Sequence, residues 1–141
     1  MVALLCWERL KPFTKTKSQT MTQHREQVIA LDSHQFIDLV NLAYHREVAA
    51  RLLANPEAVL ERARNNLQRW LAAYQPGESD AHCLEEWQSL LATRTVLELI
   101  AILTEDSDEG QRLRSSTPFA GVLSLAERKE LRKRCEEIAI A

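Results

Sequence analysis

The segment that decides the fold is residues 32–74, DSHQFIDLVNLAYHREVAARLLANPEAVLERARNNLQRWLAAY. Asp32, with Gln35 three residues later, has the pattern of a capping box at the start of a helix, and apolar residues at helical spacing follow it. Asn55-Pro56 then ends this helix, because a proline disfavours the helical conformation in the preceding residue and suits the first position of a new helix. The pattern predicts two consecutive helices, at 33–54 and 56–74.

Four more helices are predicted downstream of this segment. Thr95 with Glu98, and Ser124 with Glu127, repeat the capping-box pattern in front of apolar residues at helical spacing. The predicted helices span residues 80–92, 96–103, 109–114 and 125–138. Since no stretch alternates apolar and polar residues as a strand would, we expect an all-α fold, a single compact bundle of five or six helices with short loops.

The apolar positions also predict which helix faces are buried. We expect the first helix to bury a stripe made of Phe36, Leu39, Val40, Ala43 and Ala50. We expect its opposite face to lie in solvent, with His34, Asp38, Asn41 and His45. The helix at 96–103 is apolar nearly all round and is expected to be central. The last helix is expected to bury a narrow seam of Leu131, Cys135 and Ile138.

One charged residue interrupts the apolar stripe of the first helix. Glu47 lies in the middle of it, and Arg51 follows four residues on, a spacing that allows an ion pair along a helix. We expect a partly buried Glu47–Arg51 pair at the edge of the core. The functional alternative is a pocket carboxylate with a perturbed pKa.

Composition places the chain among small globular proteins. Its 141 residues are 45% hydrophobic and 27% charged, with a formal net charge of −2, so no overall basic excess draws it to nucleic acid or anionic lipid. Three cysteines without a C-x-x-C pair argue against a disulfide framework. No apolar run approaches the roughly 20 residues that span a bilayer. We therefore expect a cytoplasmic protein with no membrane contact.

The beginning of the chain has a different character. Residues 8–20, ERLKPFTKTKSQT, are basic and hydroxyl-rich without helical or strand periodicity, and Met21 follows them. Such a segment cannot bury enough apolar surface to offset the entropy of ordering it. Residues 1–20 are therefore either a disordered basic tail or an over-extended start, which we favour. We expect residues 21–141 to form a single helical domain.

No motif in the sequence supports catalysis. The chain has no G-x-S-x-G, no Walker loop and no H-E-x-x-H. His34 and His45 are eleven residues apart, too far along a helix to bind one ion, and His82-Cys83 has no second ligand pair at zinc-binding spacing. We therefore expect a protein that is not an enzyme, with no cofactor and no metal site.

Two sets of polar residues are candidate contacts for a partner. The helix at 56–74 carries Arg62, Asn65, Asn66 and Arg69 on one face. Arginine and asparagine suit carboxylates or base edges, although a solvated helix face explains the same residues. The second set is Arg112, Arg114, Ser115 and Ser116, whose donors suit a phosphate or carboxylate. We expect both arginines of this second set to be exposed.

The second set opens the most distinctive run of the sequence, RLRSSTPFAGVL at 112–123. Its remaining residues have an architectural interpretation. Ser116 or Thr117 is expected to cap a turn that begins at Pro118, Phe119 to fill the core, and Gly121 to allow a tight bend.

Charge is segregated along the chain. Residues 78–110 hold nine acidic residues against one arginine, and residues 111–134 hold seven basic residues against two acidic ones. The basic stretch is either a surface for nucleic acid or an acidic partner, or it compensates the acidic stretch, which we favour. The best window for a helix-turn-helix, residues 84–103, is acidic and has no glycine at its turn, which argues against DNA binding.

Several short motifs together resemble a group of bacterial proteins. They are HRE at 45–47, RL at 51–52, NP at 55–56, ARNNLQRW at 63–70, EW at 86–87 and LRSSTPFAGVL at 113–123. Over residues 42–128 the chain resembles small, mostly uncharacterised bacterial helical proteins that are antitoxin-like components of toxin–antitoxin operons. The resemblance implies a non-enzymatic module that binds a toxin-like protein partner. The alternative is a nucleic-acid-binding transcriptional regulator that uses Arg62, Arg69, Arg112, Arg114 and the basic last helix.

Overall fold

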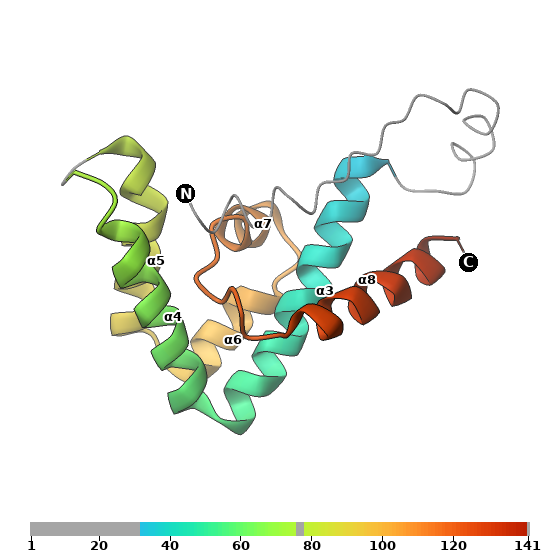
Figure 1. Ribbon diagram of the computed structural model, residues 1–141, viewed down its shortest axis with the longest axis horizontal. Helices are drawn as coiled ribbons and strands as arrows, with labels where there is room; N and C mark the ends of the chain where they lie inside the picture. The colour runs from blue at the N-terminus through green and yellow to red at the C-terminus, as the bar shows by residue number, and fades with distance from the viewer. Residues whose placement is uncertain (1–31, 76–77, 141) are drawn as a thin grey trace.

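The computed structural model describes residues 32–75 and 78–140, and this part of the chain forms six α-helices without any strand (Figure 1). The helices are α3 (Ser33–Ala54), α4 (Pro56–Leu71), α5 (His82–Thr93), α6 (Val96–Thr104), α7 (Asp108–Arg114) and α8 (Leu125–Ile140), and a short 3-10 helix, η1 (Ser79–Ala81), precedes α5. The prediction of an all-α bundle of five or six helices is confirmed. The expectation for residues 1–20 falls outside the described residues.

The helices begin where the capping patterns place them. Reciprocal capping boxes start three helices, with Asp32–Gln35 at α3, Thr95–Glu98 at α6 and Ser124–Glu127 at α8. Pro56 occupies the first turn of α4 as predicted, although the side chain of Asn55 makes no capping bond there. Helix α4 ends at Leu71, three residues earlier than expected, and the residues after it continue as turns.

The other helices are arranged around α3, which contacts α4, α6, α7 and α8. Figure 1 shows α4 and α5 side by side as one arm of the molecule. The other arm consists of α3 and of α8, which crosses it, and the two arms meet at Asn55. The loop of residues 115–124 joins α7 to α8 and runs between the arms.

Phe119, at the middle of this loop, is fully buried in the core, as predicted. Its ring meets Trp87 of α5 edge to face, with the ring centroids 5.8 Å apart, and Trp87 Nε1 donates to the carbonyl of Leu113 at 2.8 Å. Tyr44 of α3 donates from its hydroxyl to the carbonyl of Phe119 at 2.6 Å. One loop residue therefore connects α3 and α5 through its ring and its backbone.

The predicted faces of α3 are partly wrong. His45 and Asn41 were expected in solvent and are buried, whereas Ala50 was expected in the core and is exposed. A helix with neighbours on several sides has no single apolar stripe, so the spacing of its apolar residues does not identify the buried face. His45 Nδ1 lies 2.8 Å from the carbonyl oxygen of Asn41. Since a carbonyl only accepts, Nδ1 carries the ring proton.

Two further expectations about buried faces are also wrong. Leu97 is 69% exposed, so α6 buries one side, with Leu99 and Leu103, and is not surrounded by other helices. Ile138 is exposed and does not continue the seam that Leu131 and Cys135 form in α8. Figure 1 shows why, because the last turns of α8 project beyond the body of the molecule.

We predict that Phe119→Ala destabilises the fold by roughly 3–5 kcal/mol, the usual range for truncating a core aromatic residue. Urea unfolding followed by circular dichroism measures this change. Leu97→Ala is the matched control, because truncating an exposed side chain changes stability by no more than about 0.5 kcal/mol. Equal losses in the two variants would contradict the central place of Phe119.

We predict that His45 makes the fold sensitive to mild acid. Burial lowers the pKa of His45 from 6.5 to about 3. Because the unfolded chain then binds a proton that the folded chain does not, the stability is complete above pH 6.5 and falls as the pH drops below it. One such group reduces the free energy of unfolding by about 1.4 kcal/mol between pH 7.5 and pH 5.5.

Urea unfolding at the two pH values measures this loss. His45→Phe keeps a ring of similar size without a titrating group, so the loss should shrink by that amount in the variant. The other histidines of the chain are present in both proteins, so the comparison isolates His45. If the native protein and His45→Phe lose the same free energy of unfolding between the two pH values, protonation of His45 does not destabilise the fold.

Candidate functional site

Helix α4 has one buried side and one exposed side that carries arginines. Its buried residues are Val59, Ala63, Asn66, Leu67 and Trp70. Three of the residues predicted to bind a partner, Arg62, Asn65 and Arg69, are exposed together on the other side. Their spacing of three and four residues places them on one helix surface, which we call the α4 face. Arg62 and Asn65 make no hydrogen bond or ion pair within the described residues, and Arg69 donates to Asn66 Oδ1.

Asn66 attaches the 115–124 loop to α4. Asn66 shares the predicted contact face of this helix, but its side chain is buried. Its amide nitrogen donates to the carbonyls of Pro118 and Ala120, each at 2.9 Å. Buried carbonyls outside a helix need donors, and Asn66 supplies two. The loop is therefore held beside the α4 face.

The α4 face is bordered by two depressions. The corner cavity, of about 300 Å³, lies where α3 meets α4 and is lined by Arg51, Ala54, Asn55, Ala58, Val59, Arg62 and Val122. The α4 groove, of about 310 Å³, continues along the helix and is lined by Ala58, Glu61, Arg62, Asn65, Asn66 and Arg69. Ala58 and Arg62 belong to both, so the two depressions form one continuous surface with Arg62 at its centre.

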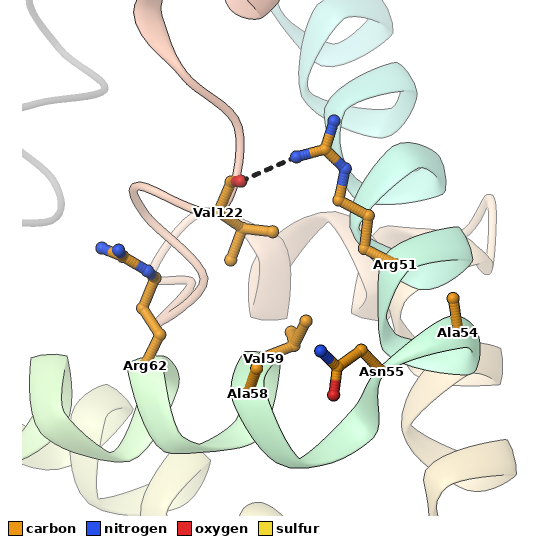
Figure 2. Close-up of a pocket in the computed structure, with 7 residues that line it drawn as sticks. All are labelled: Arg51, Ala54, Asn55, Ala58, Val59, Arg62 and Val122. Atoms are coloured by element: carbon orange, nitrogen blue, oxygen red, sulfur yellow. Dashed lines mark hydrogen bonds between the residues drawn. The ribbon is translucent and has the colours of Figure 1, made fainter.

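Figure 2 shows how the loop borders the corner cavity on one side. Val122 points down from the loop toward Val59 and Asn55, with Arg62 on one side and Arg51 on the other. Arg51 donates to the carbonyl of Val122 at 3.0 Å. The cavity therefore has apolar walls flanked by two arginines from different helices, and the guanidinium of Arg62 points away from Val122 toward the outside of the cavity.

Arg62 also fits closely against the bend of the loop. Gly121 has a φ of +84°, a conformation that favours glycine, so the predicted tight bend is confirmed. A Cβ atom at this position would lie 2.9 Å from Arg62 Nη1. Gly121 thus provides both the bend and the space in which the Arg62 side chain lies.

Arg51 pairs with a different residue from the one predicted. It forms its ion pair with Glu127 at the start of α8, and the expected pair with Glu47 is wrong. The N-terminus of α8 lies against α3, which brings Glu127 to Arg51, whereas Glu47 is partly exposed. The hydrogen bond from Arg51, followed by that from the Ser124 backbone, lowers the pKa of Glu127 to about 2.

Arg114 is a structural residue and not the exposed contact that was predicted. Its side chain is buried and donates from Nη1 to the carbonyls of Glu105 at 2.7 Å and Leu103 at 3.3 Å. These carbonyls belong to the end of α6, where a helix lacks internal donors and attracts positive charge. Gly110 allows this close approach, because a Cβ atom there would lie 2.3 Å from the carbonyl oxygen of Glu105.

The remaining residues of the second predicted set serve local structure. Arg112 is exposed as predicted, but it binds both carboxylate oxygens of Glu86, at 3.0 and 2.9 Å, and also pairs with Glu109. Ser115 is exposed and donates to the carbonyl of Arg112 at 2.7 Å. Ser116 is buried, so it is not available to a partner. Thr117, rather than Ser116, caps the turn at Pro118, since its hydroxyl accepts from the Phe119 backbone.

These contacts show that the two predicted sets of partner-binding residues differ in how far their side chains are engaged within the protein. Arg62, Asn65 and Arg69 form one open surface, while Arg112 is tied to α5 and Arg114 is tied to α6. Sequence reasoning missed the contributions of Arg51, Ala58 and Val122. The motif NP at 55–56 predicts the corner between α3 and α4, but no local signal predicts that the loop crosses it.

The remaining features that bear on function are metal sites, membrane spans and similarity to known proteins. Among the described residues, no group of three His, Cys, Asp or Glu side chains is placed to hold a metal ion. No helix in residues 32–75 and 78–140 is long and apolar enough to cross a membrane. Comparison with protein-family models, with curated proteins and with solved structures finds no match to this chain.

We predict that the low pKa of Glu127 depends on Arg51. In Arg51→Gln the pKa of Glu127 should rise from about 2 toward its ordinary value of 4.5, because the largest cause of the shift is removed. The pair stabilises the fold above pH 4.5, and this contribution is lost as the pH falls toward 2. A carbon-detected NMR titration of the carboxyl groups measures the shift.

Glu47→Gln is the matched control for this titration, and it should leave the pKa of Glu127 where it is. An unchanged Glu127 pKa in Arg51→Gln would show that the ion pair does not persist in solution.

Proposed function

We propose that the protein is a non-enzymatic helical module that binds a protein partner through the α4 face. The observation that carries this proposal is the position of Arg62. It is exposed at the centre of two continuous depressions and makes no ion pair within the described residues. Arginine is among the residues that most often anchor protein interfaces. The face belongs to a helix whose buried side is held by the core, so it is presented without a large ordering cost.

The arrangement of charge supports a protein partner over nucleic acid. Of the four arginines that a nucleic-acid regulator would use, Arg114 is buried and Arg112 is paired with two carboxylates. The α4 groove also contains Glu61, and the corner cavity has alanine and valine walls. A mixed surface of this kind suits a protein interface, whereas nucleic acid binding relies on several unpaired basic residues facing phosphates.

The resemblance described above suggests a specific form of this function. In that form the protein is a cytoplasmic antitoxin-like component, and its partner is a toxin-like protein encoded in the same operon. The α4 face would then bind the toxin and neutralise it by occupying its surface. The 63–70 motif, which contributes to the resemblance, contains Asn65 and Arg69.

The proposal is tested by reversing charge on the α4 face. Arg62→Glu with Arg69→Glu should keep the protein folded with a cooperative melting transition, because both side chains are exposed and Asn66 retains its two bonds to the loop when Arg69 is lost. The double variant should lose the partner, with affinity reduced at least about 30-fold, which corresponds to about 2 kcal/mol for hot-spot residues. Affinity capture from the native organism identifies the partner, and calorimetry with the purified partner measures affinity.

The matched control is Arg64→Glu with Arg94→Glu, which changes the net charge equally at exposed positions away from the α4 face. The control should bind the partner normally. The proposal fails if both double variants bind equally well. It also fails if the native protein instead retains nucleic acid with the steep salt dependence that many phosphate contacts produce.

A further inference from the structure

The corner cavity suggests what the partner presents to the α4 face. We propose that this cavity binds an acidic side chain of the partner, with the carboxylate on the guanidinium of Arg62 and the aliphatic stem against Val59 and Val122. This inference rests on the proposed function, and it adds the chemical identity of the group that is recognised.

The guanidinium of Arg62 is a donor at the rim of the cavity. Arg62 makes no ion pair within the described residues, and a guanidinium carries five N–H donors. Arg51 uses part of its guanidinium for the carbonyl of Val122 and for Glu127. Because Glu127 already neutralises Arg51, a carboxylate of the partner is expected at Arg62 and not at Arg51. The side-chain amide of Asn55 has no capping bond and faces the same space (Figure 2).

The walls of the cavity favour a carboxylate on an aliphatic stem. Ala54, Ala58, Val59 and Val122 provide apolar surface between the two arginines. The volume of about 300 Å³ lies at the lower end of the range of roughly 300–1,000 Å³ that is typical of ligand pockets. It therefore suits one or two side chains. A glutamate side chain covers this apolar surface and reaches the guanidinium of Arg62, whereas a free phosphate would leave the valines in contact with water.

A pair of blocked synthetic peptides tests the inference with the full chain. One alternates glutamate and alanine, and the other has glutamine in place of each glutamate. Fluorescence anisotropy should show that the glutamate peptide binds at least tenfold more tightly. Ten millimolar sodium phosphate, with sodium chloride at the same ionic strength as the control, should not displace it.

Two variants locate the binding. Arg62→Gln should weaken the glutamate peptide at least tenfold by removing the free guanidinium. Ala58→Leu should abolish binding, because position 58 is exposed on α4 and a larger side chain fills the cavity without disturbing the core. Arg64→Gln is the control on the same helix and should bind normally. The melting temperature of each variant shows that it is folded.

The inference is overturned if both peptides bind equally, if phosphate displaces the glutamate peptide, or if folded Ala58→Leu and Arg62→Gln bind it unchanged. Its failure is distinguishable from failure of the proposed function. If folded Ala58→Leu captures the native partner normally while Arg62→Glu with Arg69→Glu does not, the α4 face is the interface and the cavity is not its acidic-residue pocket.

Discussion

The structure depends on satisfying the carbonyl groups of a loop that runs between its helices. Residues 115–124 are not helical, and a buried carbonyl without a donor is costly. Three side chains from two helices donate to four of its carbonyls, with Tyr44 bonded to Phe119, Asn66 bonded to Pro118 and Ala120, and Arg51 bonded to Val122. These bonds explain why α3 and α4 carry polar residues on their inner sides.

The same requirement acts at the turn between α6 and α7. The carbonyls at the end of α6 have no donors of their own, and Arg114 supplies them from a buried position. Gly110 lets the backbone approach closely enough for this contact. Arg114, a residue type that is common in binding sites, thus stabilises the turn between α6 and α7. Arg62 of α4, in contrast, makes no hydrogen bond or ion pair within the described residues.

The candidate site follows from the position of the loop. The bonds from Asn66 bring it against α4, and Val122 then forms one wall of the corner cavity. Gly121 turns the chain where Arg62 lies, so this arginine borders both the cavity and the α4 groove. The surface proposed to bind the partner is therefore built on a rigid helix and an anchored loop, which limits the entropy lost on binding.

The sequence by itself determined the helices, because capping residues and prolines act within a few residues of themselves. Asp32, Thr95 and Ser124 start helices as their spacing predicts, and Asn55-Pro56 separates α3 from α4. The burial of Phe119 and the bend at Gly121 were also predictable, since a lone aromatic residue in a polar run and a glycine after it have few other uses. The grouping of Arg62, Asn65 and Arg69 follows from helical spacing alone.

Only the tertiary structure decided which faces are buried and which charges pair. Arg51 bonds to Glu127, 76 residues away, and Asn66 bonds to Pro118, 52 residues away. Such partners are set by the way the helices cross, which depends on contacts throughout the core. The residues next to each partner in the sequence therefore do not predict the pairing. His45 is buried for the same reason, because α3 has helices on several sides. The corner cavity needs walls from α3, α4 and the loop at once, so it exists only in the folded chain.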